Sequence, residues 1–277
     1  MEVNATMNNT RYKIGDVANL MGLSRDTLRH YEKRGILTSQ REENGYRYYT
    51  DQDISRLISI LYQRKMNIRL GDMKTLQHSE NSIDDLTAIM DIRLREEEQS
   101  IRMHQQNIAR LQLTRTDCED IRRNIGKISL QDFPAAYIIV PHTDVSQSIQ
   151  QWFAYSSQYS GLDMMYTFSE FTWRREESPA LHMEHKNSQL VLFEHLKEYV
   201  DYPIPPDTPR TPHSLLCVST CCACDSIVPS PENLLPLIDW AEQQGFLVSR
   251  QFYSTYTTRG RIDGQDSYFL RIYLPVF

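Results

Sequence analysis

The sequence has no hydrophobic run long enough to cross a membrane. Its longest apolar stretches, such as residues 234–240, are interrupted by Pro and Asp, whereas a membrane-spanning helix needs about 20 apolar residues. The first residues, MEVNATMNNTR, also lack the basic and apolar regions of a signal peptide. We therefore expect a cytoplasmic protein with no membrane partner, whose five cysteines are reduced rather than paired in disulfides.

The sequence motifs of common enzyme classes are also absent. The chain has no nucleophile elbow, no glycine-rich phosphate loop and no His-Glu-x-x-His spacing. Histidines occur at positions 182, 185 and 195, but the Met183-Glu184-His185 stretch is typical of a strand with alternating polar residues. We predict that the protein is not an enzyme and needs no cofactor.

Phe and Trp are missing from the first 132 residues, and charge is unevenly distributed. Residues 1–77 carry 13 Lys and Arg against 9 Asp and Glu, whereas residues 127–277 carry 10 against 17. A basic head joined to an acidic, aromatic-rich body is typical of a polyanion-binding module attached to a domain that does not bind polyanions.

The head is predicted to contain short helices and a hairpin. Residues 14–21 have helical apolar spacing and end at Gly22, and Ser24 caps a second helix that ends at Gly35. Two short helices with a tight turn form a helix-turn-helix. Asn44-Gly45 predicts a hairpin, or wing.

Two further helices follow the wing. Thr50-x-x-Asp53 is a capping box for a third helix, and a fourth is expected around residues 70–76. The predicted buried stripe of the third helix consists of Ile54, Leu57, Ile58 and Leu61.

Neither Pro nor Gly occurs between residues 81 and 125, which predicts one long helix. A seven-residue repeat can be followed along it, with a predicted dimerisation seam of Met90, Leu94, Ile101, Ile108, Leu111, Cys118 and Ile125. Charged residues at positions 97, 115 and 122, together with His104, interrupt this seam, which favours an antiparallel or partly packed helix pair. A lone helix packed on the body is the alternative.

The body shows the same order of elements twice. Strand-like runs at 135–141 and 215–223 each precede a helix, at 145–159 and 231–245, and then two strands, at 164–174 and 189–196 and at 246–257 and 267–275. The repeated β-α-β-β unit predicts two sheets or half-sheets meeting on a pseudo-twofold axis, with a ligand cleft at the seam.

The string YKIGDVANLMGLSRDTLRHYEKRGIL, followed by NGYRYYTDQDI, resembles the DNA-binding module of the MerR family of transcription regulators. The resemblance implies that the second helix enters the major groove of DNA and that the wing lies on the backbone and the adjacent minor groove. The predicted DNA contacts are Ser24, Arg25, Asp26, Thr27, Arg29, His30, Tyr31, Arg41, Asn44, Gly45, Tyr46 and Arg47.

The head departs from the family pattern before its fourth helix. The family usually has Gly-hydrophobic-Ser there, whereas this chain has Asn67-Ile68-Arg69. Because Asn tolerates the left-handed conformation, we expect the turn to persist without the usual Ser cap.

The body resembles the GyrI-like effector-binding domain of the multidrug-binding branch of this family, through its repeat, PLIDWAEQQGF and the ending RIYLPVF. The resemblance implies a lipophilic cation held between aromatic rings and a buried acid. The positions where the family carries acids are Tyr253 or Ser254 and Arg271 here, so the acid must come from elsewhere. The predicted effector-binding residues are Glu170, Trp173, Glu194, Tyr253, Tyr256 and Tyr268.

Four cysteines gather in the stretch CVSTCCACD, residues 217–225, which raises the alternative of a thiol-based metal or redox sensor. Side chains alternate faces along a strand, so Cys217 and Cys221 should face one way and Cys222 and Cys224 the other. Four thiolates then cannot converge on one ion, and we predict a packing role and no metal site.

The fold class expected is therefore α+β, with a flexible N-terminus (1–11), a winged helix-turn-helix (12–77), a long antiparallel coiled-coil dimerisation helix (78–126) and a repeated β-α-β-β effector domain (127–277). The function implied by the resemblance is that of a homodimer that binds a palindromic promoter with an over-long spacer. When a lipophilic, cationic small molecule binds the effector domain, the protein bends and untwists the DNA so that RNA polymerase engages the promoter.

Overall fold

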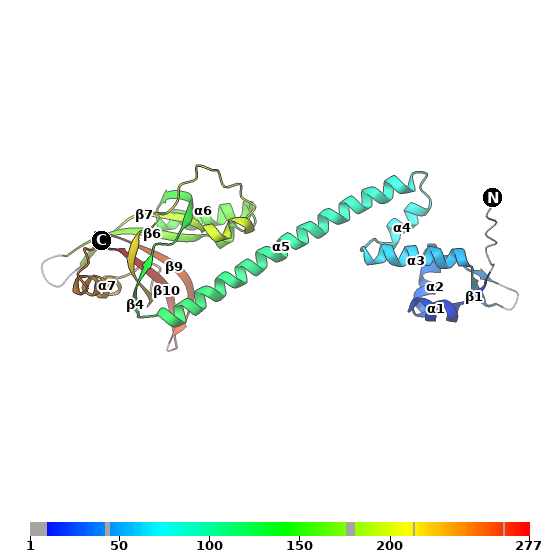
Figure 1. Ribbon diagram of the computed structural model, residues 1–277, viewed down its shortest axis with the longest axis horizontal. Helices are drawn as coiled ribbons and strands as arrows, with labels where there is room; N and C mark the ends of the chain where they lie inside the picture. Colours follow the sequence, from blue (N-terminus) through cyan, green and yellow to red (C-terminus); the bar gives the residue numbers. More distant parts are fainter. Residues whose placement is uncertain (1–9, 42–44, 176–180, 213, 263) are drawn as a thin grey trace, which may run out of the picture. The chain divides into compact units, whose positions relative to one another are not determined.

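The computed structural model describes residues 10–41, 45–175, 181–212, 214–262 and 264–277, which form two compact units. The first unit is Met1–Ile101 and the second is Arg102–Phe277. The long helix α5 (Ser82–Asn124) contributes residues to both (Figure 1). No helix in the described part of the chain is both long and apolar enough to cross a membrane.

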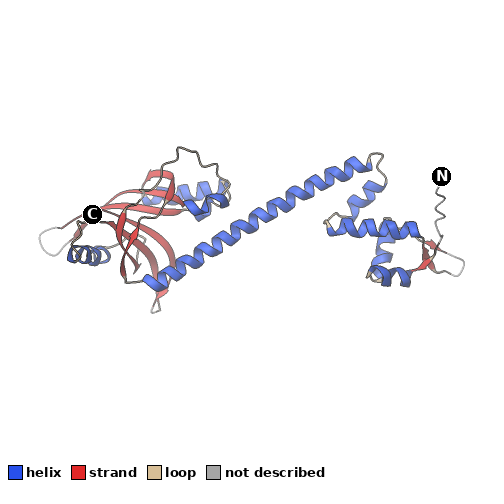
Figure 2. Cartoon of the chain, viewed as in Figure 1, coloured by secondary structure: helices blue, strands red, loops and turns tan. Residues whose placement is uncertain are grey.

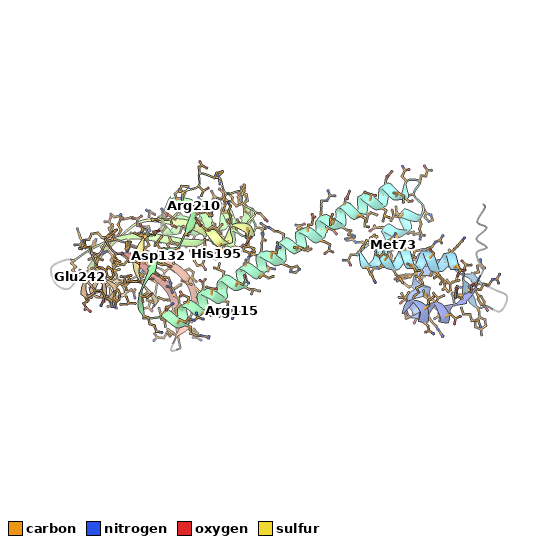
Figure 3. The ribbon with its side chains drawn as sticks, in the orientation of Figure 1. Met73, Arg115, Asp132, His195, Arg210 and Glu242 are labelled. Carbon is orange, nitrogen blue, oxygen red and sulfur yellow. The ribbon has the colours of Figure 1, made fainter. Side chains whose placement is uncertain are left out.

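The first unit is mainly helical (Figure 2). Its elements before α5 are β1 (Tyr12–Lys13), α1 (Ile14–Met21), α2 (Arg25–Arg34), β2 (Gln40–Arg41), β3 (Arg47–Tyr49), α3 (Asp51–Lys65) and α4 (Leu70–Gln77). Val17, Leu28 and Leu57 are fully buried in its core, and Met73 of α4, labelled in Figure 3, joins them. The short helices are therefore held together by one shared apolar core.

Local sequence signals determine where these helices begin and end. Ser24 accepts a hydrogen bond from the Thr27 amide, Thr50 forms the capping box with Asp53, and Gly22 and Gly35 both have positive φ. The turn before α4 has Asn67 at φ 60°, and Arg69 caps α4 without a side-chain hydrogen bond, as the departure from the family pattern predicted.

One part of the predicted core of α3 is wrong. Ile58 is 55% exposed, whereas Ile60 is 3% exposed and packs inside. The buried face of the helix follows Ile54, Leu57 and Ile60 at a spacing of three residues, and this turns Ile58 towards solvent.

The wing is a small antiparallel sheet in the order β1-β3-β2. Arg41 pairs with Arg47 across β2 and β3, and Gly45 has φ 75°, which is the conformation that such a tight connection requires. Asn44, predicted as part of this turn, lies outside the described residues.

α5 is a continuous helix of 43 residues, which confirms the prediction of one long helix. It ends where Gly126 takes the left-handed conformation at φ 69°. Four of the predicted seam residues, Leu94, Ile101, Ile108 and Leu111, are between 54% and 71% exposed. Met90 instead packs against the core of the first unit.

The second unit is built on one seven-stranded sheet in the order β4-β8-β10-β9-β6-β7-β5. Its strands are β4 (Ile128–Asp132), β5 (Ala136–Thr143), β6 (Tyr166–Arg175), β7 (Leu181–Phe193), β8 (Leu216–Cys224), β9 (Gln251–Ile262) and β10 (Gln265–Pro275). Its helices after α5 are α6 (Val145–Gln158), η1 (Leu162–Met164), η2 (Glu194–Tyr199) and α7 (Pro231–Gln243).

Two half-sheets meet along β6 and β9. Each half runs strand, helix, strand, strand, and the central antiparallel pair places Ser169 opposite Ser254. The structure differs from the expected strands in several places. β4 was not predicted, β7 begins at Leu181 rather than at 189, residues 194–196 lie in η2, and β9 is Gln251–Ile262 rather than 246–257. The β7 error arises because its first half alternates exposed polar residues, which gives a weak apolar signal.

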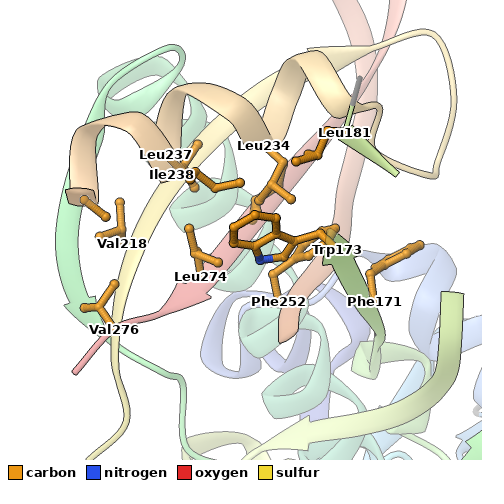
Figure 4. Close-up of a cluster of buried hydrophobic side chains, with 12 residues drawn as sticks. Phe171, Trp173, Leu181, Val218, Leu234, Leu237, Ile238, Phe252, Leu274 and Val276 are labelled. Carbon is orange, nitrogen blue, oxygen red and sulfur yellow. The ribbon is translucent and has the colours of Figure 1, made fainter. Parts of the chain in front are cut away.

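A buried cluster joins α7 to the sheet (Figure 4). Trp173 of β6 lies in it beside Phe252 and Leu234, and its indole Nε1 donates a hydrogen bond to the Ser249 carbonyl at 2.8 Å. Its ring is 5% exposed, so Trp173 is part of this core.

Candidate functional sites

The N-terminal turn of α2 is open to solvent. Arg25, Asp26, Arg29 and His30 are exposed, and Ser24 and Thr27 share a hydroxyl contact of 2.8 Å at the cap. Arg29 donates to Asp26 at 3.0 Å in an exposed ion pair, which contributes little stability and leaves both side chains free to exchange partners. Tyr31 differs from these residues, because it is 8% exposed and belongs to the core.

The wing is fastened to α2 through Glu32. Arg47 Nε donates to Glu32 Oε2 at 2.8 Å, and the Tyr49 hydroxyl donates to Glu32 Oε1 at 2.7 Å. Burial, followed by the hydrogen bond to Glu32, raises the pKa of Tyr49. One carboxylate therefore fixes the wing relative to the second helix, while Arg41 and Tyr46 remain exposed nearby.

The second unit contains a cavity of about 480 Å³ between α5, α6, η1, β6 and β9. Most of its walls are apolar or aromatic. They consist of Arg110, Leu113, Thr114, Asp117, Ile149, Trp152, Asp163, Met164, Met165, Tyr166, Thr167, Tyr256 and Thr257.

Two carboxylates and one guanidinium line this cavity. Arg110 binds Asp163 with two hydrogen bonds of 2.6 and 2.7 Å, and this pairing holds the pKa of Asp163 below its usual range. Asp117 accepts a hydrogen bond from the Tyr166 hydroxyl, but burial still raises the pKa of its carboxyl. The nearby Arg271 pairs with Asp120. Among the described residues, Asp117 is the acid of the cavity wall that forms no salt bridge, although the positive charge of Arg271 partly offsets the effect of burial on its pKa.

The residues predicted to bind an effector lie in several places. Tyr256 lines the cavity, and the centroid of the Tyr268 ring lies 6.0 Å from the centroid of the Tyr256 ring. Tyr253 packs against Phe133 at 4.8 Å in another cluster.

The two predicted acids already have partners. Glu170 accepts a hydrogen bond from Asn187 at 2.8 Å, and Glu194 pairs with Arg210 at 2.9 Å. Asp117, Asp163 and Trp152, which line the cavity, were not predicted from the sequence as residues of the site. Asp117 belongs to the helix assigned to dimerisation, and no sequence pattern indicated which face of that helix meets the sheet.

The cysteine cluster divides between the two faces of β8. Cys217 and Cys221 are buried, and burial raises the pKa of Cys221 to about 11. Cys222 packs on the opposite side, against the cluster around Leu234. Within the described ranges, no group of three or more His, Cys, Asp or Glu side chains is arranged to hold a metal ion.

Comparison with known proteins identifies the first unit. Residues 12–80 match the model of the MerR HTH family regulatory protein. The chain is 28% identical to the mercuric resistance operon regulatory protein of Bacillus cereus over 41% of this chain and 76% of that protein. It is 38% identical to the HTH-type transcriptional activator TipA of Streptomyces coelicolor over 24% of this chain and 26% of TipA.

Among solved structures, one match extends over most of the chain. The cryo-EM structure of the EcmrR-DNA complex in EcmrR-RPo covers 96% of this chain and 99% of that chain, with 17% identity and a TM-score of 0.35. The capped helix pair and the wing both lie within residues 12–80, the part of this chain that matches the MerR HTH family model.

Proposed function

We propose that the protein is a homodimeric, effector-responsive transcription regulator that binds double-stranded promoter DNA. The observation that carries the proposal is the exposed, Ser24-capped start of α2 beside a wing held in place by Glu32. A helix N-terminus with exposed polar side chains reads base edges in a major groove, and a wing bearing Arg41 and Arg47 contacts phosphates. The excess of Lys and Arg over Asp and Glu in the head, 13 against 9, supports the same role.

The dimer would form through α5. Leu94, Ile101 and Ile108 follow one another at seven-residue intervals and are each more than half exposed in the single chain. An apolar stripe of this kind is stabilised when a second helix covers it. Two paired chains would present their recognition helices to the two halves of a palindromic operator.

The cavity of the second unit is the proposed effector site, and a lipophilic cation is the proposed ligand. Three aromatic rings, those of Trp152, Tyr166 and Tyr256, line it together with the partly buried acid Asp117, which accepts a hydrogen bond from Tyr166. Aromatic faces attract a cation through their quadrupole, and a desolvated carboxylate adds Coulomb attraction. Neutral lipophiles of equal size gain only the apolar contacts.

Activation would follow from a change in DNA shape. A promoter with an over-long spacer places its two elements out of alignment for RNA polymerase, and bending with untwisting realigns them. The effector switches the promoter only if it binds the DNA-distorting state more tightly than the inactive state.

The DNA contact is tested with Arg47→Ala. We expect weaker binding to any duplex and a fall of about one in the slope of log affinity against log salt, because one phosphate contact is lost. Fluorescence anisotropy with a generic duplex over a salt series measures both. Arg261→Ala, which removes an exposed arginine of β9, is the control and should leave the slope unchanged. Glu32→Gln weakens the attachment of the wing but keeps Arg47, so an equal fall in its slope would attribute the effect to a loosened wing. An Arg47→Ala slope equal to that of the wild type would contradict the phosphate contact.

The dimer is tested with Ile108→Glu, which places a charge in the middle of the predicted seam. We expect the wild-type chain to sediment as a dimer and the variant as a monomer, because a buried unpaired carboxylate is costly. Met103→Glu alters a residue on α5 that is also exposed (51%) but lies off the seam, and it should remain dimeric. A dimer that survives Ile108→Glu would disprove this seam.

The effector site is tested with Asp117→Asn. We expect calorimetry to show a loss of about tenfold or more in affinity for tetraphenylphosphonium, whereas the neutral triphenylphosphine oxide binds the variant and the wild type equally. Asp266→Asn, at an exposed ion pair, is the matched control. Equal cation affinity in both variants would rule out Asp117 as the selecting acid.

The same site predicts a pH dependence. Because burial raises the pKa of Asp117 above the usual Asp value of about 3.9, this acid takes up a proton earlier than other carboxylates as the pH falls. Cation affinity should therefore be full at neutral pH and fall on acidification in the wild type, with little change in Asp117→Asn.

A further inference from the structure

Two thiols meet on the outer end of β8. Cys222 and Cys224 are two residues apart in the strand, so their side chains lie on the same face, and their sulfur atoms are 3.5 Å apart. Both are partly exposed, unlike Cys217 and Cys221. β4 pairs only with Leu216–Thr220, so this end of β8 extends beyond its neighbour on that side.

The surroundings hold the pair in place and make its two members unequal. Cys224 Sγ lies 3.4 Å from Asn233 Oδ1 of α7, and Asn233 also accepts a hydrogen bond from the Ser230 amide at 2.8 Å. The thiol–thiol hydrogen bond lowers the pKa of Cys224 and, together with burial, raises that of Cys222. Cys224 is therefore the first of the two to ionise and react.

The sulfur spacing suits a bridging atom better than a disulfide. Two thiolates bound at about 2.3 Å to one tetrahedral centre lie about 3.8 Å apart, close to the observed separation. A disulfide needs sulfurs at about 2.05 Å and Cα atoms within about 6.8 Å, and residues two apart in an extended strand reach about 6.6 Å. A disulfide would therefore span a Cα separation near its upper limit and would have to draw the two sulfurs together from 3.5 Å, whereas a bridging atom needs little change in their separation.

A ligand of this site must be one that is held by bonds to only two protein atoms, the two sulfurs. No third acidic, His or Cys ligand is grouped with the pair in the described part of the chain, and the amide oxygen of Asn233 is a poor partner for a soft centre. This disfavours zinc, which takes three or four protein ligands. The lack of a third protein ligand among the described residues favours a thiol-binding atom that already carries a substituent of its own in its third position.

We propose that Cys222 and Cys224 form a two-thiolate site for trivalent organoarsenical compounds. With phenylarsine oxide, two As–S bonds form and the arsenic–oxygen bonds break. The oxygen leaves as water with the two thiol protons, and arsenic stays trivalent, so no oxidant is needed. This site is independent of the proposed effector cavity.

The experiment adds phenylarsine oxide to the full-length reduced protein and follows the adduct by native mass spectrometry. We expect one adduct per chain that survives excess 2-mercaptoethanol and is released by dithiothreitol, because only a dithiol competes with a chelating pair. Cys222→Ser and Cys224→Ser should each lose it. Cys217→Ser, Cys221→Ser and Cys118→Ser should keep it, the last of these removing the exposed single thiol of α5.

A measurement on the wild-type chain guards against a variant that fails to fold. Bound arsenical should protect two thiols from iodoacetamide, and peptide mapping should locate them at 222 and 224. Protection elsewhere, an adduct that persists in Cys224→Ser, or an adduct that forms only after denaturation would overturn the proposal.

Discussion

The attachment of α5 to the sheet of the second unit is the contact on which the rest of that unit depends. Four charged or polar pairs fix the helix from its middle onward, two to the sheet (Asp117–Tyr166 and Asp120–Arg271) and two to segments beside it (Arg102–Asp201 and Arg110–Asp163). Apart from the exposed Asp201, these groups are at least partly buried, so breaking a pair would leave a poorly hydrated charge without its partner. Their geometry determines which face of α5 meets the sheet and which carries the exposed apolar stripe.

This attachment gives one helix two proposed roles. Arg110 and Asp117 form a wall of the cavity, while Ile108 and Leu111, within one turn of Arg110, are exposed and belong to the proposed dimer seam. A ligand that alters the Asp117–Tyr166 hydrogen bond would act directly on the helix through which the two chains are proposed to pair. In this account, the energetic coupling between effector and DNA passes through a rigid secondary element with ligand contacts on one face.

The sequence predicted local structure well and long-range neighbours poorly. Ser24, Thr50 and the positive-φ glycines determine helix ends through contacts within a few residues, so the order of helices in the head could be predicted. Trp173 and Asp117 depend on which elements pack together, which periodicity does not reveal. An aromatic residue expected in a pocket therefore lies in the core, and an acid from the presumed dimer helix lines the cavity. For the cysteines, strand alternation correctly separated two pairs of thiols, but the 3.5 Å contact within one pair required the structure.

The central claim is that ligand bound in the second unit changes DNA held by the first. The most direct measurement takes an operator selected from random duplexes, labels its ends with a fluorescent donor and acceptor, and follows their distance by energy transfer when tetraphenylphosphonium is added. The account predicts a shorter distance with the wild-type protein and no change with Asp117→Asn. If the cation binds the wild-type complex and leaves both the DNA geometry and the affinity unchanged, the account is contradicted.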